Sequence, residues 1–173
     1  VVTPGLSRAE VKLRGLHNVE NLLAAIAAVW GRVPVDVMRQ VGSTFTGVEH
    51  RIEPVRVLDG VTYYNDSIAS SPTRTIAGLR SFDQKIILIA GGYDKKIPYE
   101  PLAPEIVAHV KVLVLMGATA PRIEKAVRED PNFDPQALPI LHADSMQHAV
   151  ELARGAAKPG DIVSLSPASA SFD

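Results

Sequence analysis

Five consecutive apolar residues at positions 86–90, Ile-Ile-Leu-Ile-Ala, constrain the fold of this 173-residue chain more than any other feature. The run shows no alternation of polar and apolar residues, so both faces of the strand that it predicts should be buried, as in the centre of a parallel sheet. It continues into Gly91-Gly92 and a charged group, Asp94-Lys95-Lys96. Because ligands of open α/β sheets bind at the carboxyl ends of strands, this turn is the first candidate for a site.

The alternation of strand and helix around this run predicts the fold class. Apolar runs predict strands at residues 51–58, 61–65, 86–90, 112–116, 139–142 and 162–165. Proline at first helical positions and serine at caps predict helices that begin near residues 72, 104, 121 and 145. Asp59-Gly60 is a strong hairpin signal, so residues 51–58 should form an antiparallel edge strand. The chain is therefore predicted to be α/β, with a doubly wound, mostly parallel sheet and one antiparallel edge strand.

The first quarter of the chain follows a different, purely helical pattern. Apolar residues at helical spacing predict a helix that begins at Asn18 and ends before Gly31. A second short helix should run from Pro34 to Gly42, and we place a domain boundary near Gly47. This helical hairpin looks like the remainder of a preceding domain.

Composition excludes several classes of function. The net charge of −1 gives no electrostatic reason to bind nucleic acid or an anionic membrane, and no apolar run is long enough to span a bilayer. Without cysteine, neither disulfides nor thiolate chemistry are available, and the five histidines show no metal-ligand spacing. The chain ends abruptly at Ser-Phe-Asp173, inside a promising loop, so we expect a fragment of a longer protein.

Several polar groups have two interpretations. Asn18 and Asn21 fit a helix cap with a capping-box partner, which the pattern favours, but a helix N-terminus with two amides could also bind a nucleotide. Asp66 could accept hydrogen bonds from a ribose or belong to an Asx-turn. Lys95 could bind a carboxylate or phosphate, or Gly91-Gly92 and the residues after it could be a common turn that follows a strand. Arg51 could hold a phosphate or be a solvated charge.

The topology favours a real site. Asp66, the turn at residues 92–95, Gly117 and the serine-rich segment 166–171 all follow predicted parallel strands, so they should lie at one edge of the sheet. Segment 166–171 is too polar and too small to be core, and it should be either a ligand-binding loop or a mobile terminus.

In this order the residues resemble the Mur ligase family. Five motifs occur in the family's order and spacing, and together they span nearly the whole chain. They are His17-Asn-Val-Glu-Asn21, Thr46-Gly-Val-Glu-His-Arg51, Tyr64-Asn-Asp-Ser-Ile-Ala-Ser-Ser-Pro72, Leu88-Ile-Ala-Gly-Gly-Tyr-Asp-Lys95 and Leu165-Ser-Pro-Ala-Ser-Ala-Ser-Phe-Asp173. The resemblance implies that residues 1–47 are the tail of an ATP-binding central domain. Residues 48–173 would be the Rossmann-like C-terminal glutamate ligase domain, truncated before its last helix.

The resemblance also implies roles for individual residues. Contacts to ATP would come from Asn18, Asn21, Arg51 and Asp66, with Arg51 on the phosphates and Asp66 on the ribose. The positions that match D-glutamate contacts are Lys95, Ser70, Ser171 and Phe172. No catalytic residue and no metal ligand is assigned within the chain. Ile68 departs from the family, since many members carry lysine there, and a cationic contact is lost.

The implied reaction is amide-bond formation in peptidoglycan precursor synthesis. The complete, ADP-forming enzyme would use ATP and Mg²⁺ to form an acyl phosphate on UDP-N-acetylmuramoyl-L-alanine, which the amine of D-glutamate then attacks. A monomer in the bacterial cytoplasm is expected. The glycine-rich phosphate loop and the magnesium ligands would precede Val1, so the chain alone should neither hydrolyse ATP nor ligate.

Two alternatives remain. The chain could belong to another ligase of the same superfamily, such as a folylpolyglutamate synthetase, which exchange of the amino-acid substrate would reveal. It could also be a non-catalytic Rossmann-like binding module, whose function would be indifferent to Lys95→Ala and Asp66→Ala.

Overall fold

The computed structural model describes residues 6–170, and the chain divides into two units between Val48 and Glu49. The first unit contains a short 3₁₀ helix (Arg8–Glu10) and two helices, α1 (Leu16–Val29) and α2 (Val35–Thr44). Many of its apolar side chains are exposed, and Trp30 is 52% accessible.

The start of α1 differs from the prediction. Gly15, not Asn18, is the N-terminal cap, and it has a positive φ of 83°. Asn18 lies inside the first turn, where its side-chain amide donates to the Arg14 carbonyl at 2.7 Å. The prediction was wrong because Gly15, a glycine with positive φ, precedes the first helical residue and caps the helix. The Asn18 side chain then donates to the carbonyl of Arg14, the residue before Gly15.

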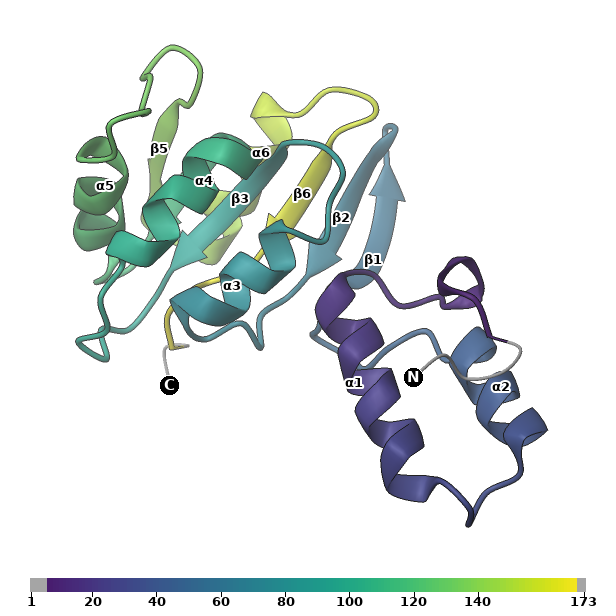
Figure 1. Ribbon diagram of the computed structural model, residues 1–173. Coiled ribbons are helices and arrows are strands. Elements are labelled where there is room, and N and C mark those ends of the chain that lie inside the picture. The colour runs from purple at the N-terminus through teal and green to yellow at the C-terminus, as the bar shows by residue number, and fades with distance from the viewer. Residues whose placement is uncertain (1–5, 171–173) are drawn as a thin grey trace. The chain divides into compact units, whose positions relative to one another are not determined.

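The second unit is built on one six-stranded sheet (Figure 1). Its strands are β1 (Glu53–Leu58), β2 (Val61–Asn65), β3 (Ile86–Gly91), β4 (Val110–Met116), β5 (Ile140–Ala143) and β6 (Ile162–Leu165). The spatial order is β1-β2-β6-β3-β4-β5. Only β1 and β2 pair antiparallel, while the other neighbouring strands pair in parallel. The predicted fold class is confirmed, including the antiparallel edge strand.

The hairpin that forms this edge turns at Asp59-Gly60. Both residues have positive φ, 52° and 77°, as a two-residue turn between right-twisted strands requires. The first strand starts at Glu53, two residues later than predicted, because Ile52 has a φ of 46° and cannot continue an extended strand.

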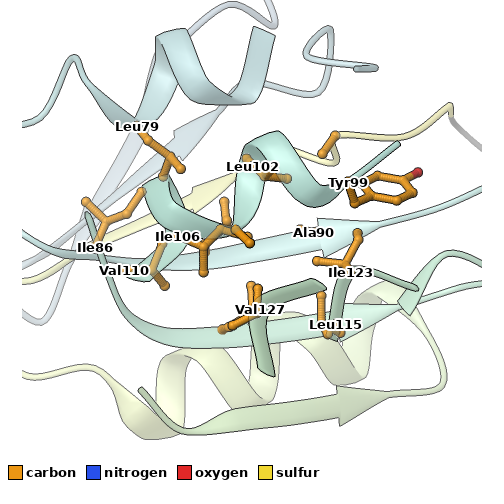
Figure 2. Packing of buried hydrophobic residues seen from close by; sticks show 14 of the residues in the cluster. Leu79, Ile86, Ala90, Tyr99, Leu102, Ile106, Val110, Leu115, Ile123 and Val127 are labelled. Atoms are coloured by element: carbon orange, nitrogen blue, oxygen red, sulfur yellow. The ribbon is translucent and has the colours of Figure 1, made fainter. Parts of the chain in front are cut away.

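Helices cover both faces of the sheet. They are α3 (Pro72–Leu79), α4 (Ala103–His109), α5 (Ala120–Arg128) and α6 (Met146–Ala156). Leu79, Ile106 and Ile123 bring α3, α4 and α5 into one core, which Figure 2 shows, and Ala149 and Ala153 bring α6 into a second core.

Strand β3 contributes to both cores. Ile86, Leu88 and Ala90 point into the first, Ile87 and Ile89 into the second, and none is more than 2% exposed. Burying one Leu or Ile side chain contributes about 1.5–3 kcal/mol. The predicted central strand therefore fixes the position of the turn that follows it.

Candidate functional site

The carboxyl ends of the parallel strands carry three connected segments. Backbone hydrogen bonds join them: Ala168 N donates to Ala69 O, Gly91 N to Pro167 O, and Tyr93 N to Ala170 O, at 2.8–3.0 Å. The prediction that residues 66, 92–95, 117 and 166–170 gather at one edge is confirmed for the described residues. Residue 171 lies outside them.

On one side of this edge is the Asp66 turn, residues 65–68. Asp66 is 4% exposed, and its carboxylate accepts from Ile52 N at 3.2 Å and from the Ser166 hydroxyl at 2.8 Å. Burial raises the pKa of Asp66 above its ordinary value of 3.8, while the hydrogen bonds from Ser166 and Ile52 and the charge of Arg51 oppose that rise. Thr75, also buried, lies 3.1 Å from the Ser166 hydroxyl.

Two further observations complete the Asp66 turn. Ser67 N donates to Asn65 Oδ1 at 3.0 Å, so Asn65 forms the Asx-turn that was one interpretation of this segment. A Cβ on Gly78 of α3 would lie 2.8 Å from Asp66 Oδ2, so the absence of a side chain there leaves room for the carboxylate. No sequence signal had marked Gly78.

The Asp66 turn also holds the segment that carries Arg51. His50 and Ile52 on either side have positive φ, 65° and 46°, which is costly for a β-branched residue. The conformation is maintained by bonds to the turn, from Ile68 N to His50 O and from Ile52 N to Asp66. Arg51 itself is exposed, and its charge acts on Asp66. Two of the predicted ATP-binding residues are therefore neighbours in this unit.

On the other side of the edge is the Lys95 turn, residues 93–98. It follows Gly91 and Gly92, where a Cβ would lie 1.9 Å from Met116 O and 2.2 Å from Ala170 O, respectively. Only glycine therefore lets β3 pass this close to its neighbours. Lys95 is exposed and makes no hydrogen bond or ion pair with another described residue. Its ammonium group is available to an anion.

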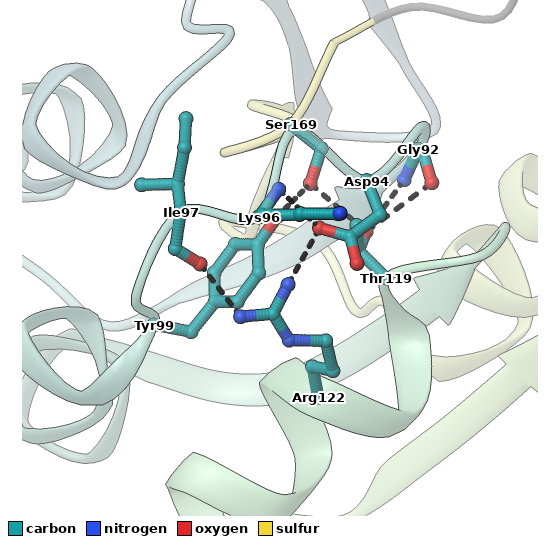
Figure 3. Close-up of polar contacts among 8 residues, drawn as sticks. All are labelled: Gly92, Asp94, Lys96, Ile97, Tyr99, Thr119, Arg122 and Ser169. Carbon is teal, nitrogen blue, oxygen red and sulfur yellow. Dashed lines mark hydrogen bonds and ion pairs between the residues drawn. The ribbon is translucent and has the colours of Figure 1, made fainter.

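A network that sequence reasoning missed fixes the base of the Lys95 turn (Figure 3). The Thr119 hydroxyl accepts from Gly92 N at 2.9 Å and lies 2.9 Å from the Ser169 hydroxyl. Ser169 in turn lies 2.8 Å from the hydroxyl of buried Tyr99. One signal could have revealed Thr119, since Thr-Ala-Pro is typical of a helix start, and Thr119 is the N-cap residue of α5.

The burial of the serine-rich segment 166–170 differs from what the sequence predicted. Ser166 and Ser169 are 3% and 2% exposed, so the segment is not excluded from the interior by its polarity. Hydroxyl groups can be buried when they have hydrogen-bond partners, and here Asp66, Thr75, Thr119 and Tyr99 provide them. The expectation that this segment is too polar and too small to be core is therefore wrong for Ser166 and Ser169.

The remaining predicted residues lie beside the Asp66 turn, in the first unit or outside the described residues. Ser70 is half-buried beside the Asp66 turn, where its N donates to Ile68 O, and Ile68 is 47% exposed. Ser171 and Phe172 lie outside the described residues. Asn18 and Asn21 belong to the first unit, and the Asn21 amide approaches Asn18 Oδ1 at 3.5 Å.

Residues 6–170 contain no group of three or more His, Cys, Asp or Glu side chains that could hold a metal ion. Among the helices in the same range, none has the length and apolar character needed to cross a membrane.

Comparison with known proteins identifies the family. Residues 50–169 match the family model described as "Mur ligase, glutamate ligase domain". The chain belongs to the Mur ligase family. The match covers the Asp66 turn, the Lys95 turn and the segment that contains Ser166 and Ser169.

Individual relatives agree with this assignment. The chain is 59% identical over 167 residues to the UDP-N-acetylmuramoylalanine–D-glutamate ligase of Acetivibrio thermocellus, a match that covers 95% of this chain and 36% of that protein. It is 56% identical to the ligase of the same name from Symbiobacterium thermophilum, over 99% of this chain and 37% of that protein. The chain thus spans little more than a third of these curated relatives.

Solved structures share the fold. Folylpolyglutamate synthase from Mycobacterium tuberculosis, complexed with ADP, gives a TM-score of 0.67 at 18% identity, over 91% of this chain and 39% of that one. MurF from Acinetobacter baumannii gives 0.67 at 15% identity, over 90% and 35%. At these identities the likeness shows a shared fold and nothing about activity.

Proposed function

We propose that this chain is the glutamate-accepting part of an ADP-forming ligase that adds D-glutamate to UDP-N-acetylmuramoyl-L-alanine. The observation that carries the proposal is the 59% identity, over 95% of the chain, to a relative with that activity in its name. The protein would act in the bacterial cytoplasm as a monomer, in the synthesis of peptidoglycan precursors.

The Lys95 turn supports the acceptor role. D-glutamate is a dicarboxylate, and Lys95 offers an exposed ammonium group at the edge where α/β sheets bind ligands. Ser70, Ser171 and Phe172 would complete the contacts to the amino acid. In this role Lys95 binds and orients D-glutamate so that its amine faces the activated carboxyl group.

The Asp66 turn supports the nucleotide role. The positive-φ conformation around Arg51 holds in place a cation that would bind the ATP phosphates. Asp66, proposed on the ribose side, is buried against Ile52 N and Ser166 and would hold this segment in position there. Asn18 and Asn21 would contact the adenine. In this proposal residues 1–47 are the tail of the ATP-binding central domain, and residues 48–173 are the glutamate ligase domain.

The proposed reaction proceeds through an acyl phosphate. The free carboxylate of the L-alanine in UDP-N-acetylmuramoyl-L-alanine attacks the terminal phosphorus of ATP, and ADP leaves. The D-glutamate amine then attacks the acyl carbon, and phosphate leaves as the amide forms. Magnesium would supply charge neutralisation on the phosphates. Residues 6–170 contain no group of three or more His, Cys, Asp or Glu side chains, and we place the magnesium ligands in the central domain of the ligase. What this chain contributes is orientation and positive charge.

The test is product formation by the full-length natural protein. It should form the amide with D-glutamate and release ADP, and L-glutamate should not replace the D-isomer. Lys95→Ala should raise the KM for D-glutamate at least about tenfold, because a charge-assisted hydrogen bond is lost. Lys125→Ala is the matched control, since it removes an exposed cation of α5 whose one ion-pair partner among residues 6–170 is Glu129, the residue after the helix.

A second candidate function has a specific basis in the fold. The likeness to folylpolyglutamate synthase leaves open that another ligase of this superfamily extends a different acceptor. Substituting a folate for the UDP-muramoyl substrate separates the two. Amide formation with the folate and not with UDP-N-acetylmuramoyl-L-alanine would contradict the proposal.

A further inference from the structure

The Lys95 turn contains no helix or strand of its own. Its first residue, Tyr93, forms an isolated bridge with Ala170, and residues 94–98 have no regular structure. Lys96 has a positive φ of 58°, which is unfavourable for a residue other than glycine. Something outside the turn must therefore hold it in this shape if Lys95 is to point in a fixed direction.

Arg122, in the first turn of α5, provides that support (Figure 3). Its Nη1 contacts Asp94 Oδ1 at 2.5 Å and its Nη2 donates to Ile97 O at 3.0 Å. The two contacts lie one residue before Lys95 and two residues after it. One planar guanidinium group therefore fixes both ends of the segment that carries the ammonium group.

The position of Arg122 is itself fixed. Its guanidinium carbon lies 5.3 Å from the centre of the Tyr99 ring, a cation–π contact. Tyr99 is buried and its hydroxyl lies 2.8 Å from that of Ser169. Arg122 is thus supported from the same network that anchors Gly92 at the base of the turn.

Arg122 also forms an ion pair with Asp94, whose carboxylate is the closest to Lys95 in sequence. Hydrogen bonding from Lys96 N, with a further contribution from Arg122, lowers the pKa of Asp94, so this group is ionised at neutral pH. Without Arg122, the Asp94 carboxylate would be an available partner for Lys95 and would repel an incoming dicarboxylate.

We propose that Arg122 is a positioning residue for D-glutamate: it fixes the Lys95 turn and engages Asp94, so that Lys95 stays available for the substrate. The inference rests on the proposed function, because it assumes that Lys95 binds D-glutamate. It goes beyond that function, because Arg122 touches neither the substrate nor a reacting atom and acts through Lys95.

The test is steady-state kinetics of the full-length ligase with Arg122→Met. The KM for D-glutamate should rise about tenfold, while the KM for ATP and kcat at saturating D-glutamate change less than about twofold. Arg128→Met is the matched control. Arg128 lies on the same helix, pairs with Glu124 at 2.7 Å and covers the Phe133 ring at 5.6 Å, but has no contact with the Lys95 turn.

If Arg122 only stabilised the fold, a second substitution at Asp94 would not restore affinity for D-glutamate. Asp94→Asn in the Arg122→Met background should recover part of the lost affinity, because the competing carboxylate is gone. Arg122→Lys should fall between wild type and Arg122→Met, since it keeps the charge but not the two-pronged contact. If Arg122→Met were to misfold, Arg122→Lys and Asp94→Asn alone should still raise the KM for D-glutamate selectively.

The outcomes separate the two proposals. An unchanged KM for D-glutamate in Arg122→Met would overturn the positioning role. An equal rise in the KM for ATP would overturn it as well. If Lys95→Ala still raised the KM in the same assay, the proposed function would stand. Indifference of D-glutamate binding to Lys95→Ala would overturn both.

Discussion

The Asp66 turn and the Lys95 turn follow parallel strands at the same edge of one sheet, yet they are held in opposite ways. The Asp66 carboxylate is buried and satisfied by groups from two other segments. The Asp94 carboxylate beside Lys95 is partly exposed, with an ion pair to Arg122 and a hydrogen bond from Lys96 N. The comparison shows a buried, hydrogen-bonded frame on one side and an exposed, charged turn held by Arg122 on the other.

The energetics of the two turns should differ accordingly. A buried hydrogen bond to a charged group contributes about 1.5–3 kcal/mol, and removing one partner leaves the others unsatisfied. An exposed ion pair contributes about 0–1 kcal/mol and weakens with salt. The Asp66 turn should therefore matter most for folding, and the Lys95 turn most for binding.

The largest expected effect lies where the Lys95 turn meets the rigid part of the sheet. Gly91→Ala would place a Cβ 1.9 Å from Met116 O at a φ of 112°, so we expect a loss of about 4 kcal/mol or more. Gly155→Ala is the control, because its Cβ would meet nothing within 4 Å in α6, and it should stabilise by about 0.5 kcal/mol. Urea unfolding checks both.

Near-ultraviolet dichroism can follow the unfolding of the second unit by itself. All four tyrosines lie in the second unit, whereas the single tryptophan, Trp30, lies in the first. Near-ultraviolet dichroism in a Trp30→Phe background therefore follows the second unit. An unfolding free energy for Gly91→Ala within about 0.5 kcal/mol of wild type, the range of neutral surface substitutions, would contradict the close approach at this position.

The next effect compares the two aspartates directly. Asp66→Ala should destabilise the second unit by about 2–4 kcal/mol, because Ile52 N and Ser166 lose their shared acceptor in a buried place. Asp94→Ala should change stability little, since its partner Arg122 remains hydrated. Equal losses in the two variants would remove the distinction between the turns.

The smallest effect concerns pH, and its sign differs between the two turns. The pKa of Asp66 is raised in the folded state, so its favourable contribution is full below the ordinary value of 3.8 and is lost as pH rises through the folded pKa. The pKa of Asp94 is lowered, so its contribution is present above 3.8 and is lost as pH falls through the folded pKa.

Unfolding of Asp66→Asn and Asp94→Asn beside wild type, at pH values on both sides of 3.8, measures this difference. The excess free energy of unfolding of wild type over Asp66→Asn should shrink as pH rises. The excess of wild type over Asp94→Asn should grow. Slopes of the same sign would show that burial does not distinguish these carboxyl groups.

Local signals in the sequence were sufficient to predict the strands, the mostly parallel sheet and its antiparallel edge, but not the order of the strands. The unbroken apolar run at residues 86–90 identified the central strand because both of its faces are buried. Asp59-Gly60 identified the edge hairpin because its turn needs two positive φ values. Helix boundaries were less certain, and Gly15 replaced Asn18 as the cap of α1.

The supports of the site could not be predicted in the same way. Arg122 meets Asp94 from 28 positions along the chain, and Tyr99 meets Ser169 from 70 positions away. Such contacts depend on which strands are neighbours in the sheet, and no local pattern encodes that order. The sequence thus indicated which edge carries the candidate site, but not what holds its charged turn in place.

The most direct test of this account is D-glutamate binding by titration calorimetry to the full-length ligase with bound nucleotide. Wild type and Lys125→Ala should bind D-glutamate and not L-glutamate, Lys95→Ala should bind at least about tenfold more weakly, and Arg122→Met should fall between them. Equal affinity in wild type and Lys95→Ala would contradict the claim that this exposed turn receives the amino acid.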